Sequence, residues 1–501
     1  MKKKMLFVMA TIAAFTLFVP SVWAAEVDSD LAAAVNAATD GDTLTLTKDI
    51  EVTSVITIDE ELTLDLAGFD VLFKNNSYLL VEGGNLTVTG EGKMAEETPY
   101  YAPILVKGST DSTATNYSVV AIGEDVCLEG WAGVFVRQNS TNTAYGVNIT
   151  VNGTIESLKD EEGVTGHGVY VNGSIKHTTN APVITLGETA VITSEGTGIY
   201  AAGYAVWNIN GATITGVENG LAIKSGKINI TGGTITATGE DLRPTESYNN
   251  GVNPSGAAIQ IESNKGYAGN IELNISGGTF VSENSVAVYE YLALGDENDT
   301  TDDTSETSVS NISISGGSFE SFYENFDVSD SFNDENTGFV TGGTFDDLYV
   351  EEGYLSTEED YVVTGEGEVI LESDAVYLTM IGVVDGKVVE NSESTVAIKK
   401  GYKLSDEDLA DFELIEKDIN ETFEEDGFVF LGFFTDKEGK DKVDFTKALD
   451  SDATWYMVVG EKVEELPPKT GDINLVVLIG TILVGMAGMA IVIRKRFAKC
   501  N

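Results

Sequence analysis

Short runs of alternating apolar and polar residues recur along most of the chain. In residues 62–64 and 227–231 every second side chain is apolar, which is the pattern of a strand with one buried and one exposed face. Turns separate these runs, and 53 glycines against eight prolines indicate many tight turns. The pattern predicts an all-β body of short strands.

A six-residue unit repeats within this body. It consists of an aliphatic residue, a polar residue, two small residues, Thr or Ser, and a further apolar residue, and it starts at Ile209, Ile230, Ile275, Ile314 and Val340. The starts are therefore 21, 45, 39 and 26 residues apart. We interpret the interval of 45 as two units with an intermediate strand at residues 257–261, and the interval of 39 as one unit with an acidic insertion at residues 295–308. A period of 21 to 26 residues is typical of a β-solenoid.

The solenoid model makes further predictions. Three short strands per coil, stacked about 4.8 Å apart, would satisfy the backbone groups of neighbouring coils. The exposed end needs a cover, and residues 29–39 predict a short helical cap. Asn229, Asn274 and Asn311 precede glycine corners and are expected to form stacked side-chain hydrogen bonds. An array of β-sandwiches is the alternative, because it shares alternation and glycine turns.

These features carry a family resemblance. Residues 25–373 resemble a right-handed parallel β-helix of the pectin-lyase-like kind, and the Ser-Gly-Gly-Thr-Phe signature at residues 276–280 resembles repeats of Gram-positive surface proteins. Enzymes of this shape use an Arg or Lys base beside carboxylates, or grouped aspartates.

The pattern changes in residues 374–464. A hairpin is predicted around residues 382–386 and a short acidic helix over residues 405–414, followed by an aromatic stretch at residues 427–436. This region resembles the Listeria–Bacteroides repeat, which implies a small β-grasp-like module. Phe433 and Phe434 stand where that family usually has Trp and Tyr.

The N-terminus predicts secretion. Three lysines follow Met1, and an apolar run extends from Met5 to about Val19 before Ala24 and Ala25. A basic start, a short apolar core and small residues are typical of a signal peptide, here residues 1–24. We expect cleavage after Ala24, with Ala25 as the alternative position. A retained N-terminal anchor is the other interpretation.

The C-terminus predicts a membrane span. Residues 473–493 carry no charge and are long enough to cross a bilayer as a helix. The tail, residues 494–501, contains Arg494, Lys495, Arg496 and Lys499. Basic residues stay on the cytoplasmic side, so we expect the body of the protein to lie outside the cell.

A sorting motif precedes the span at residues 466–471. It consists of Leu466, Pro467, Pro468, Lys469, Thr470 and Gly471. Together with the span and the basic tail, it resembles the substrates of sortases in Gram-positive bacteria. The resemblance implies cleavage between Thr470 and Gly471 and transfer of Thr470 to peptidoglycan. Pro467 occupies the usual Leu position, so the sortase class stays open, and a plain single-pass anchor is the alternative.

Composition limits the partners of the chain. Its 81 acidic and 29 basic side chains give a net charge of −52, which repels nucleic acid. Cys127 lies in the body and Cys500 in the tail, so no disulfide stabilises the fold, and packing and hydrogen bonds must do so.

No catalytic set or cofactor is predicted. The processed chain keeps two arginines, Arg137 and Arg243, and two histidines, His167 and His177. We expect Arg137 to be a solvated outward charge and His177 to be incidental. The acidic insertion lacks the ligand spacing of a calcium loop, so no metal site is predicted.

The expected function is non-enzymatic binding at the cell surface. Trp131, Trp207 and Tyr204 are candidates for stacking on sugars, with core packing as their alternative role. We expect an adhesin or display scaffold for a glycan or for a host or bacterial surface protein. A carbohydrate-active β-helix, either lyase or hydrolase, and a passive surface spacer are the alternatives.

Overall fold

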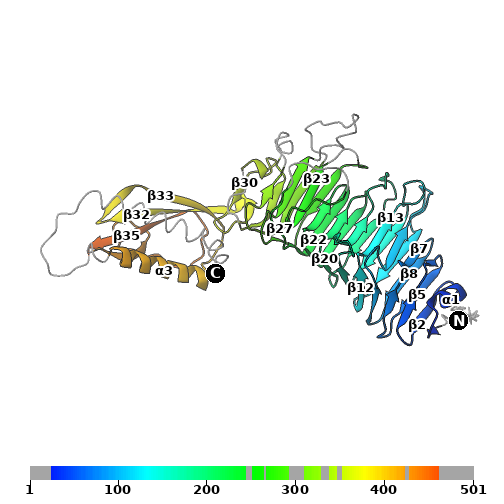
Figure 1. The fold of residues 1–501 in the computed structure, drawn as a ribbon. Coiled ribbons are helices and arrows are strands. Elements are labelled where there is room, and N and C mark those ends of the chain that lie inside the picture. The colour runs from blue at the N-terminus through cyan, green and yellow to red at the C-terminus, as the bar shows by residue number, and fades with distance from the viewer. Residues whose placement is uncertain are drawn as a thin grey trace, which may run out of the picture.

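The computed structural model describes residues 24–243, 251–263, 267–292, 310–328, 338–346, 352–423 and 428–461. A long stack of parallel strands begins beside helix α1 (Leu31–Ala37), and a smaller unit containing helix α3 (Asp406–Phe423) follows it (Figure 1).

Two parallel sheets form the stack. The nineteen-stranded sheet contains β1 (Ala24–Val27), β2 (Asp42–Leu46), β3 (Ile50–Val52), β5 (Glu61–Asp65), β6 (Val71–Phe73), β8 (Asn85–Thr89), β9 (Gly92–Glu96), β11 (Ser118–Ile122), β12 (Val126–Gly130), β14 (Val147–Val151), β15 (Thr154–Ser157), β17 (Val183–Leu186), β18 (Val191–Ser194), β20 (Val206–Gly216), β22 (Gly226–Ala237), β24 (Ile271–Ile275), β25 (Thr279–Ser282), β27 (Ser310–Ser321) and β29 (Val340–Phe345). The ten-stranded sheet contains β4 (Ile56–Ile58), β7 (Leu79–Glu82), β10 (Ile104–Lys107), β13 (Ala132–Arg137), β16 (His167–Val171), β19 (Thr197–Ala201), β21 (Asn219–Ile223), β23 (Ile259–Ser263), β26 (Val288–Leu292) and β28 (Phe326–Asp327).

The strand pairing is that of a parallel β-solenoid. In the early coils each strand pairs in parallel with the strand three positions further along the chain, as β7 does with β10 and β10 with β13. Each coil there contributes one strand to the ten-stranded sheet and two to the other. The predicted three strands per coil are therefore confirmed. The alternative of a β-sandwich array is wrong, because sandwiches are built from antiparallel sheets.

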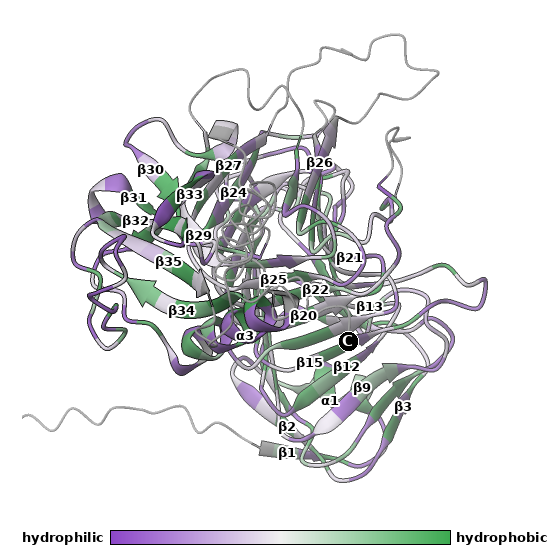
Figure 2. Ribbon diagram, turned by 90° about the vertical axis from the view of Figure 1, so that its left-hand side faces the viewer, coloured by the Kyte–Doolittle hydropathy of each residue, from purple (hydrophilic) through white to green (hydrophobic). Residues whose placement is uncertain are grey.

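Aliphatic side chains fill the interior of the solenoid. Inward residues such as Val134, Ile199 and Ile259 are fully buried and belong to one continuous core, and hydrophobic colouring follows the strands in Figure 2. Helix α1 places Leu31 against the first coils, and Asp30 caps its N-terminus by accepting a hydrogen bond from the Ala33 N–H. The predicted cap is thus a helix that packs on the solenoid.

The prediction that the interval of 45 residues between two glycine pairs spans two units is wrong. Strand β22, which contains Gly233, pairs directly with β24 and β25, which flank Gly278. The interval of 45 residues is therefore one coil with a long insertion, not two units. The predicted intermediate strand exists as β23, but it belongs to the ten-stranded sheet of that same coil.

The asparagine ladder is confirmed in part. Asn229 donates a side-chain hydrogen bond to Asn208 at 3.2 Å, and Asn274 donates one to Asn229 at 3.2 Å. Asn311 is not a member, because it pairs in register with Glu272 while Ser313 lies beside Asn274. The motif spacing did not reveal this register.

A short antiparallel hairpin follows the solenoid. It consists of β30 (Tyr361–Val363) and β31 (Val369–Leu371), with 3-10 turns η1 (Glu352–Tyr354) before it and η2 (Glu372–Asp374) after it. Val369 is buried in the solenoid core.

The smaller unit is a four-stranded mixed sheet with one helix. Its strands are β32 (Ala375–Val384), β33 (Lys387–Lys399), β34 (Phe428–Phe434) and β35 (Ala453–Glu461), in the spatial order β33-β32-β35-β34. The central pair β32 and β35 is parallel and the outer pairs are antiparallel. The predicted hairpin turn lies between β32 and β33.

Helix α3 extends beyond its predicted end at residue 414. It continues to Phe423 because Phe412, Ile415 and Ile419 recur at helical spacing and are buried against the sheet.

No helix within the described ranges is long and apolar enough to cross a membrane. The expected span at residues 473–493, the tail at 494–501 and the sorting motif at 466–471 lie outside the described residues, as do residues 1–23 of the expected signal peptide.

Candidate functional site

The two residues at the expected signal cleavage site lie in the first strand. Ala24 and Ala25 pair with Thr43 and Leu44 of β2. Cleavage after either residue would shorten β1 but leave Glu26 and Val27 paired. The six residues of the expected sorting motif, Leu466, Pro467, Pro468, Lys469, Thr470 and Gly471, lie outside the described residues, so their assignment stays a prediction.

The ten-stranded sheet turns every second side chain away from the solenoid core. On β13, Val134 and Val136 point into that core while Phe135 belongs to a separate outer cluster. Register pairing aligns the outward residues of successive coils into one column: Leu80, Leu105, Phe135, Tyr170, Tyr200, Ala222, Gln260 and Tyr289. The outer face of the sheet therefore carries a line of mostly apolar and aromatic side chains.

Five aromatic residues gather on the N-terminal half of this face, and we call them the aromatic patch: Tyr78, Tyr101, Trp131, Phe135 and Tyr170. The rings of Phe135 and Tyr170 stack with centroids 4.5 Å apart and planes 16° apart. Trp131 meets Tyr170 edge-on at 6.0 Å, and Tyr78 meets Tyr101 edge-on at 5.9 Å. Phe135 is buried, and the other four residues are each half-buried. Four aromatic side chains thus reach solvent without belonging to the solenoid core.

A buried carboxylate holds two members of the aromatic patch in place. Glu96 accepts backbone hydrogen bonds from the N–H groups of Tyr101 at 3.0 Å and Trp131 at 3.0 Å, and one from Tyr100 at 3.1 Å. Its side chain is only 6 % exposed, and burial raises its pKa above the ordinary value although these N–H donors oppose the shift. Glu96 therefore positions the backbone of two half-buried aromatic residues from neighbouring coils.

The C-terminal half of the same face is covered. Tyr200 stacks on Tyr170 with centroids 5.2 Å apart, yet only 4 % of Tyr200 is exposed. Val252, in the insertion between β22 and β23, packs against the cluster that contains Tyr200. The accessible part of the aromatic column is therefore its N-terminal half.

A column of charged side chains lies beside the aromatic patch, at the C-terminal ends of β7, β10 and β13. Glu82, Lys107 and Arg137 occupy one register column on β7, β10 and β13. Lys107 Nζ lies 3.5 Å from Glu82 Oε2, and the Arg137 guanidinium carbon lies 6.0 Å from the centre of the Tyr101 ring. Arg137 thus points outward, as expected, and places hydrogen-bond donors beside an aromatic ring.

The two histidines have different surroundings. His167 is 7 % exposed and lies between Trp131 and Tyr200, and burial lowers its pKa to about 3. It is therefore neutral at physiological pH. His177 joins two loops, because its Nε2 accepts a hydrogen bond from the Ala144 N–H at 3.0 Å. His177 thus has a structural contact within these loops.

The three aromatic residues singled out in the sequence separate into different roles. Trp131 belongs to the aromatic patch, but Trp207 is fully buried in the solenoid core. Tyr204 is half-buried and is not in the outward column. Tyr78, Tyr101, Phe135 and Tyr170 were not recognised as site residues. The last two follow aligned Gly-Val pairs, and that alignment was the available signal.

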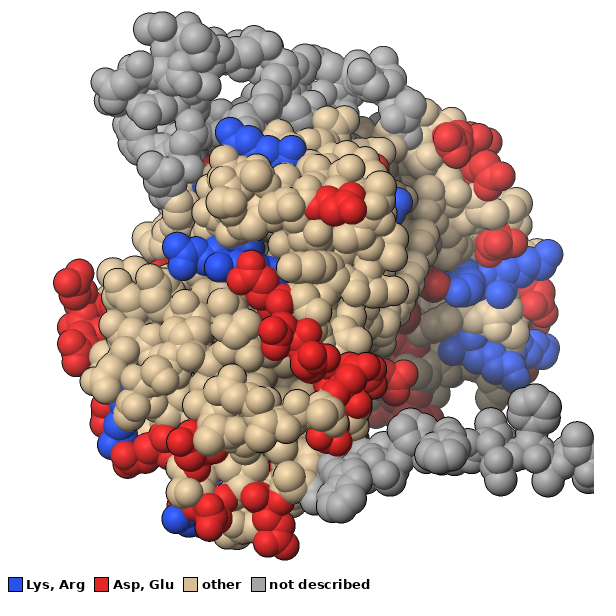
Figure 3. All heavy atoms as spheres, turned by 90° about the vertical axis from the view of Figure 1, so that its right-hand side faces the viewer, with Lys and Arg blue, Asp and Glu red and all other residues tan. Residues whose placement is uncertain are grey.

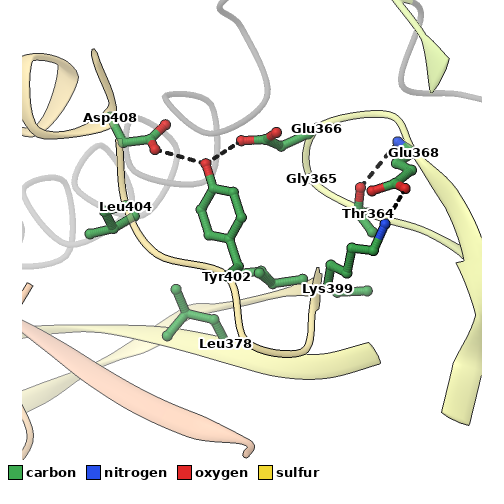
Figure 4. Close-up of a pocket in the computed structure, with 11 residues that line it drawn as sticks. Thr364, Gly365, Glu366, Glu368, Leu378, Lys399, Tyr402, Leu404 and Asp408 are labelled. Carbon is green, nitrogen blue, oxygen red and sulfur yellow. Dashed lines mark hydrogen bonds and ion pairs between the residues drawn. The ribbon is translucent and has the colours of Figure 1, made fainter. Parts of the chain in front are cut away.

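A small cavity lies between the hairpin and the smaller unit (Figure 4). Its volume is about 100 Å³ and its lining includes Thr364, Glu366, Leu378, Lys399, Tyr402 and Asp408. Figure 4 shows the Tyr402 hydroxyl between two carboxylates, 2.5 Å from Glu366 Oε1 and 2.7 Å from Asp408 Oδ2. The cavity is smaller than typical ligand sites of about 300–1,000 Å³. Its polar contacts connect the two regions of the chain.

The surface chemistry matches the acidic composition. In the view of Figure 3, acidic side chains form long tracts and basic side chains occur in smaller groups. Among the described residues, no group of three or more His, Cys, Asp or Glu side chains is arranged to hold a metal ion.

Comparison with known proteins identifies no relative of this chain. No protein-family model matches the chain, and neither the curated proteins nor the solved structures searched contain a match. The functional argument therefore depends on the chain's own residues and geometry.

Proposed function

We propose that this chain is a secreted surface protein of a Gram-positive bacterium that binds glycans through the aromatic patch. A signal peptide ending at Ala24 or Ala25 directs export. A sortase then cleaves between Thr470 and Gly471 and joins Thr470 to peptidoglycan. The apolar segment 473–493 and the basic tail hold the precursor in the membrane until that step.

In this proposal the solenoid is a right-handed β-helix of the pectin-lyase-like kind, used as a display scaffold. The smaller unit is a β-grasp-like module related to the Listeria–Bacteroides repeat. Its central parallel strands, flanked by antiparallel neighbours and crossed by one helix, support that relationship. The module spaces the β-helix from the wall.

The aromatic patch is the observation that carries the binding function. Exposed aromatic rings offer flat apolar faces for the C–H groups of a sugar ring, while neighbouring polar groups bond to its hydroxyls. Trp131 and Tyr101 supply such rings, and Glu96 fixes the backbone of both. A net charge of −52 disfavours polyanions, so the proposed ligand is an uncharged glycan chain.

The first test is a screen of the full chain, displayed on bacteria, against glycan and matrix-protein arrays, with sugar release measured in parallel. The proposal expects binding to uncharged glycans without release. The Trp131→Ala variant should bind more weakly, whereas Phe322→Ala should bind as the unaltered chain does, because Phe322 is 59 % exposed at a distant coil. Sugar release would instead establish a carbohydrate-active enzyme. Absence of both binding and release would favour a passive spacer.

Anchoring needs a separate test. Replacing Thr470 with Ala keeps the backbone carbonyl but removes the side chain by which a sortase would recognise the motif, so the chain should shift from the wall fraction to the membrane fraction. Thr446→Ala is a matched control in the smaller unit. An unchanged wall fraction for Thr470→Ala would contradict sortase anchoring.

A further inference from the structure

A buried ion pair lies further along the outer side of the ten-stranded sheet. Lys224 directly follows β21 and Glu262 lies on β23, so the two residues belong to consecutive coils. Lys224 Nζ is 2.6 Å from Glu262 Oε1, and the two side chains are only 2 % and 1 % exposed. By comparison, the side chains of the Arg243–Asp241 ion pair are 24 % and 23 % exposed.

Such a pair is expensive to keep as two charges. Removing an ammonium and a carboxylate from water costs several kcal/mol per ion, and the attraction repays this only with good geometry and further hydrogen bonds. Although Nζ lies close to Oε1, it makes no well-directed hydrogen bond within the described part of the chain. The amine is thus close to the carboxyl group without being well satisfied as an ammonium donor.

The second oxygen of Glu262 is held by neutral donors. The Tyr291 hydroxyl donates to Oε2 at 2.9 Å, and Asn253 Nδ2 donates to the same oxygen at 3.2 Å. The ring centre of Tyr267 lies 5.6 Å from Lys224 Nζ. One oxygen of the carboxyl group therefore faces the amine, while hydrogen-bond donors withdraw charge from the other in a site closed to bulk water.

We propose that Lys224 and Glu262 condense into an intramolecular amide, an isopeptide bond between neighbouring coils. The Nζ–Cδ bond forms and one Cδ–O bond of Glu262 breaks. The ammonium supplies the two protons that leave with that oxygen as water. The step is balanced, because an ammonium and a carboxylate give one amide and one water, with no oxidant or co-reactant.

Two physical arguments favour this step. Fixing the reacting groups at contact distance replaces a bimolecular encounter by an intramolecular one, which is equivalent to a very high local concentration. Condensation also converts two buried charges into one neutral amide and thereby removes the desolvation cost. Asn253 and Tyr291, as donors to Oε2, stabilise the charge that develops on the departing oxygen.

The bond would replace the disulfides that this exported chain lacks. It would tie β21 to β23 across the long insertion that contains Val252, and so close a covalent loop in the part of the solenoid with the longest connections. The inference does not depend on glycan binding.

The test is mass spectrometry of the purified full chain. The proposal expects an intact mass one water below that of the processed sequence. After denaturation and trypsin digestion it expects a branched peptide joining Lys224 to Glu262, and no cleavage after Lys224. A sequence-matching mass with normal cleavage after Lys224 would overturn it, as would loss of ammonia with Asn253 as the joined residue.

Variants sharpen this result. Lys224→Met keeps an unbranched side chain of similar size but removes the amine, so the intact mass should no longer be one water below that of the variant's processed sequence. Lys227→Met is the matched control, because Lys227 pairs with Glu272 at 2.9 Å on the surface, with 41 % and 42 % exposure, and it should retain the water loss. If Lys224→Met does not fold, peptide mapping of the unaltered chain still decides the question.

Discussion

The N-terminal half of the solenoid and the smaller unit use aromatic residues in opposite ways. In the smaller unit, Phe412, Phe433, Phe445 and Trp455 contact one another inside the core. In the N-terminal half of the solenoid, the core is almost wholly aliphatic and the aromatic patch lies outside it. Stacked coils fill their interior with Ile, Val and Leu, so the outer aromatic residues are not needed to form the core. This difference is the reason for assigning the patch to binding.

The largest expected effect is in the smaller unit. Trp455→Ala removes a ring that is 5 % exposed and lies 5.6 Å from the Phe445 ring, so it should lower the free energy of unfolding by about 3–5 kcal/mol. Urea unfolding followed by circular dichroism would measure this. Leu431→Ala, at a side chain 46 % exposed, should change stability by less than about 0.5 kcal/mol. Equal losses would contradict the described core.

The second-largest expected effect is at a corner of the solenoid. Gly233 has φ +97°, and an added Cβ would lie 2.2 Å from the carbonyl oxygen of Ala212 in the neighbouring coil. Gly233→Ala should therefore cost about 2–4 kcal/mol, from backbone strain together with the backbone clash. Gly41→Ala is the control, because Gly41 has φ +88° but open space around it, and it should cost only about 1 kcal/mol. Thermal unfolding of both variants would separate the cost of the positive φ, which both share, from the cost of the clash with the neighbouring coil, which only Gly233→Ala has.

Acid should weaken the solenoid before the smaller unit. Burial lowers the pKa of His167 to about 3, whereas a histidine in the unfolded chain has a pKa near 6.5. The unfolded state therefore binds the extra proton between these values, and His167 contributes a loss of about 1.4 kcal/mol in the free energy of unfolding per pH unit below about pH 6.5. Both histidines of the chain lie in the solenoid. Hydrogen exchange measured at pH 7 and pH 5 should show that the amides around β16 lose more protection than those of the smaller unit.

A variant tests the origin of that loss. His167→Asn should remove much of the acid dependence around β16, while His177→Gln should leave most of it. An unchanged pH profile in His167→Asn would assign the acid response to other groups.

The sequence predicted the solenoid because its repeat is local and visible. Alternation located the strands, the glycine pairs located the corners, and residues 29–39 located the cap. The interval between Gly233 and Gly278 was misread because an insertion in one coil has the same length as an additional coil. Only the pairing of β22 with β24 and β25 resolves that ambiguity.

The candidate site was less predictable, because it depends on register between coils. Tyr101 and Trp131 lie 30 positions apart, and the shared contact with Glu96 that fixes them is not a sequence motif. Lys224 and Glu262 are likewise separated by an insertion. Trp207 is buried in the solenoid core whereas Trp131 lies on the outer face, a difference that the sequence analysis left open.

The measurement that tests the central claim most directly is a titration of the full chain and its Trp131→Ala variant with the uncharged glycan found by the array screen. The unfolding free energies of both proteins would be measured alongside. The account predicts about tenfold weaker binding, equivalent to about 1.4 kcal/mol, with little change in stability because Trp131 lies outside the solenoid core. Unchanged affinity in Trp131→Ala, with the fold intact, would contradict a glycan-binding role for the aromatic patch.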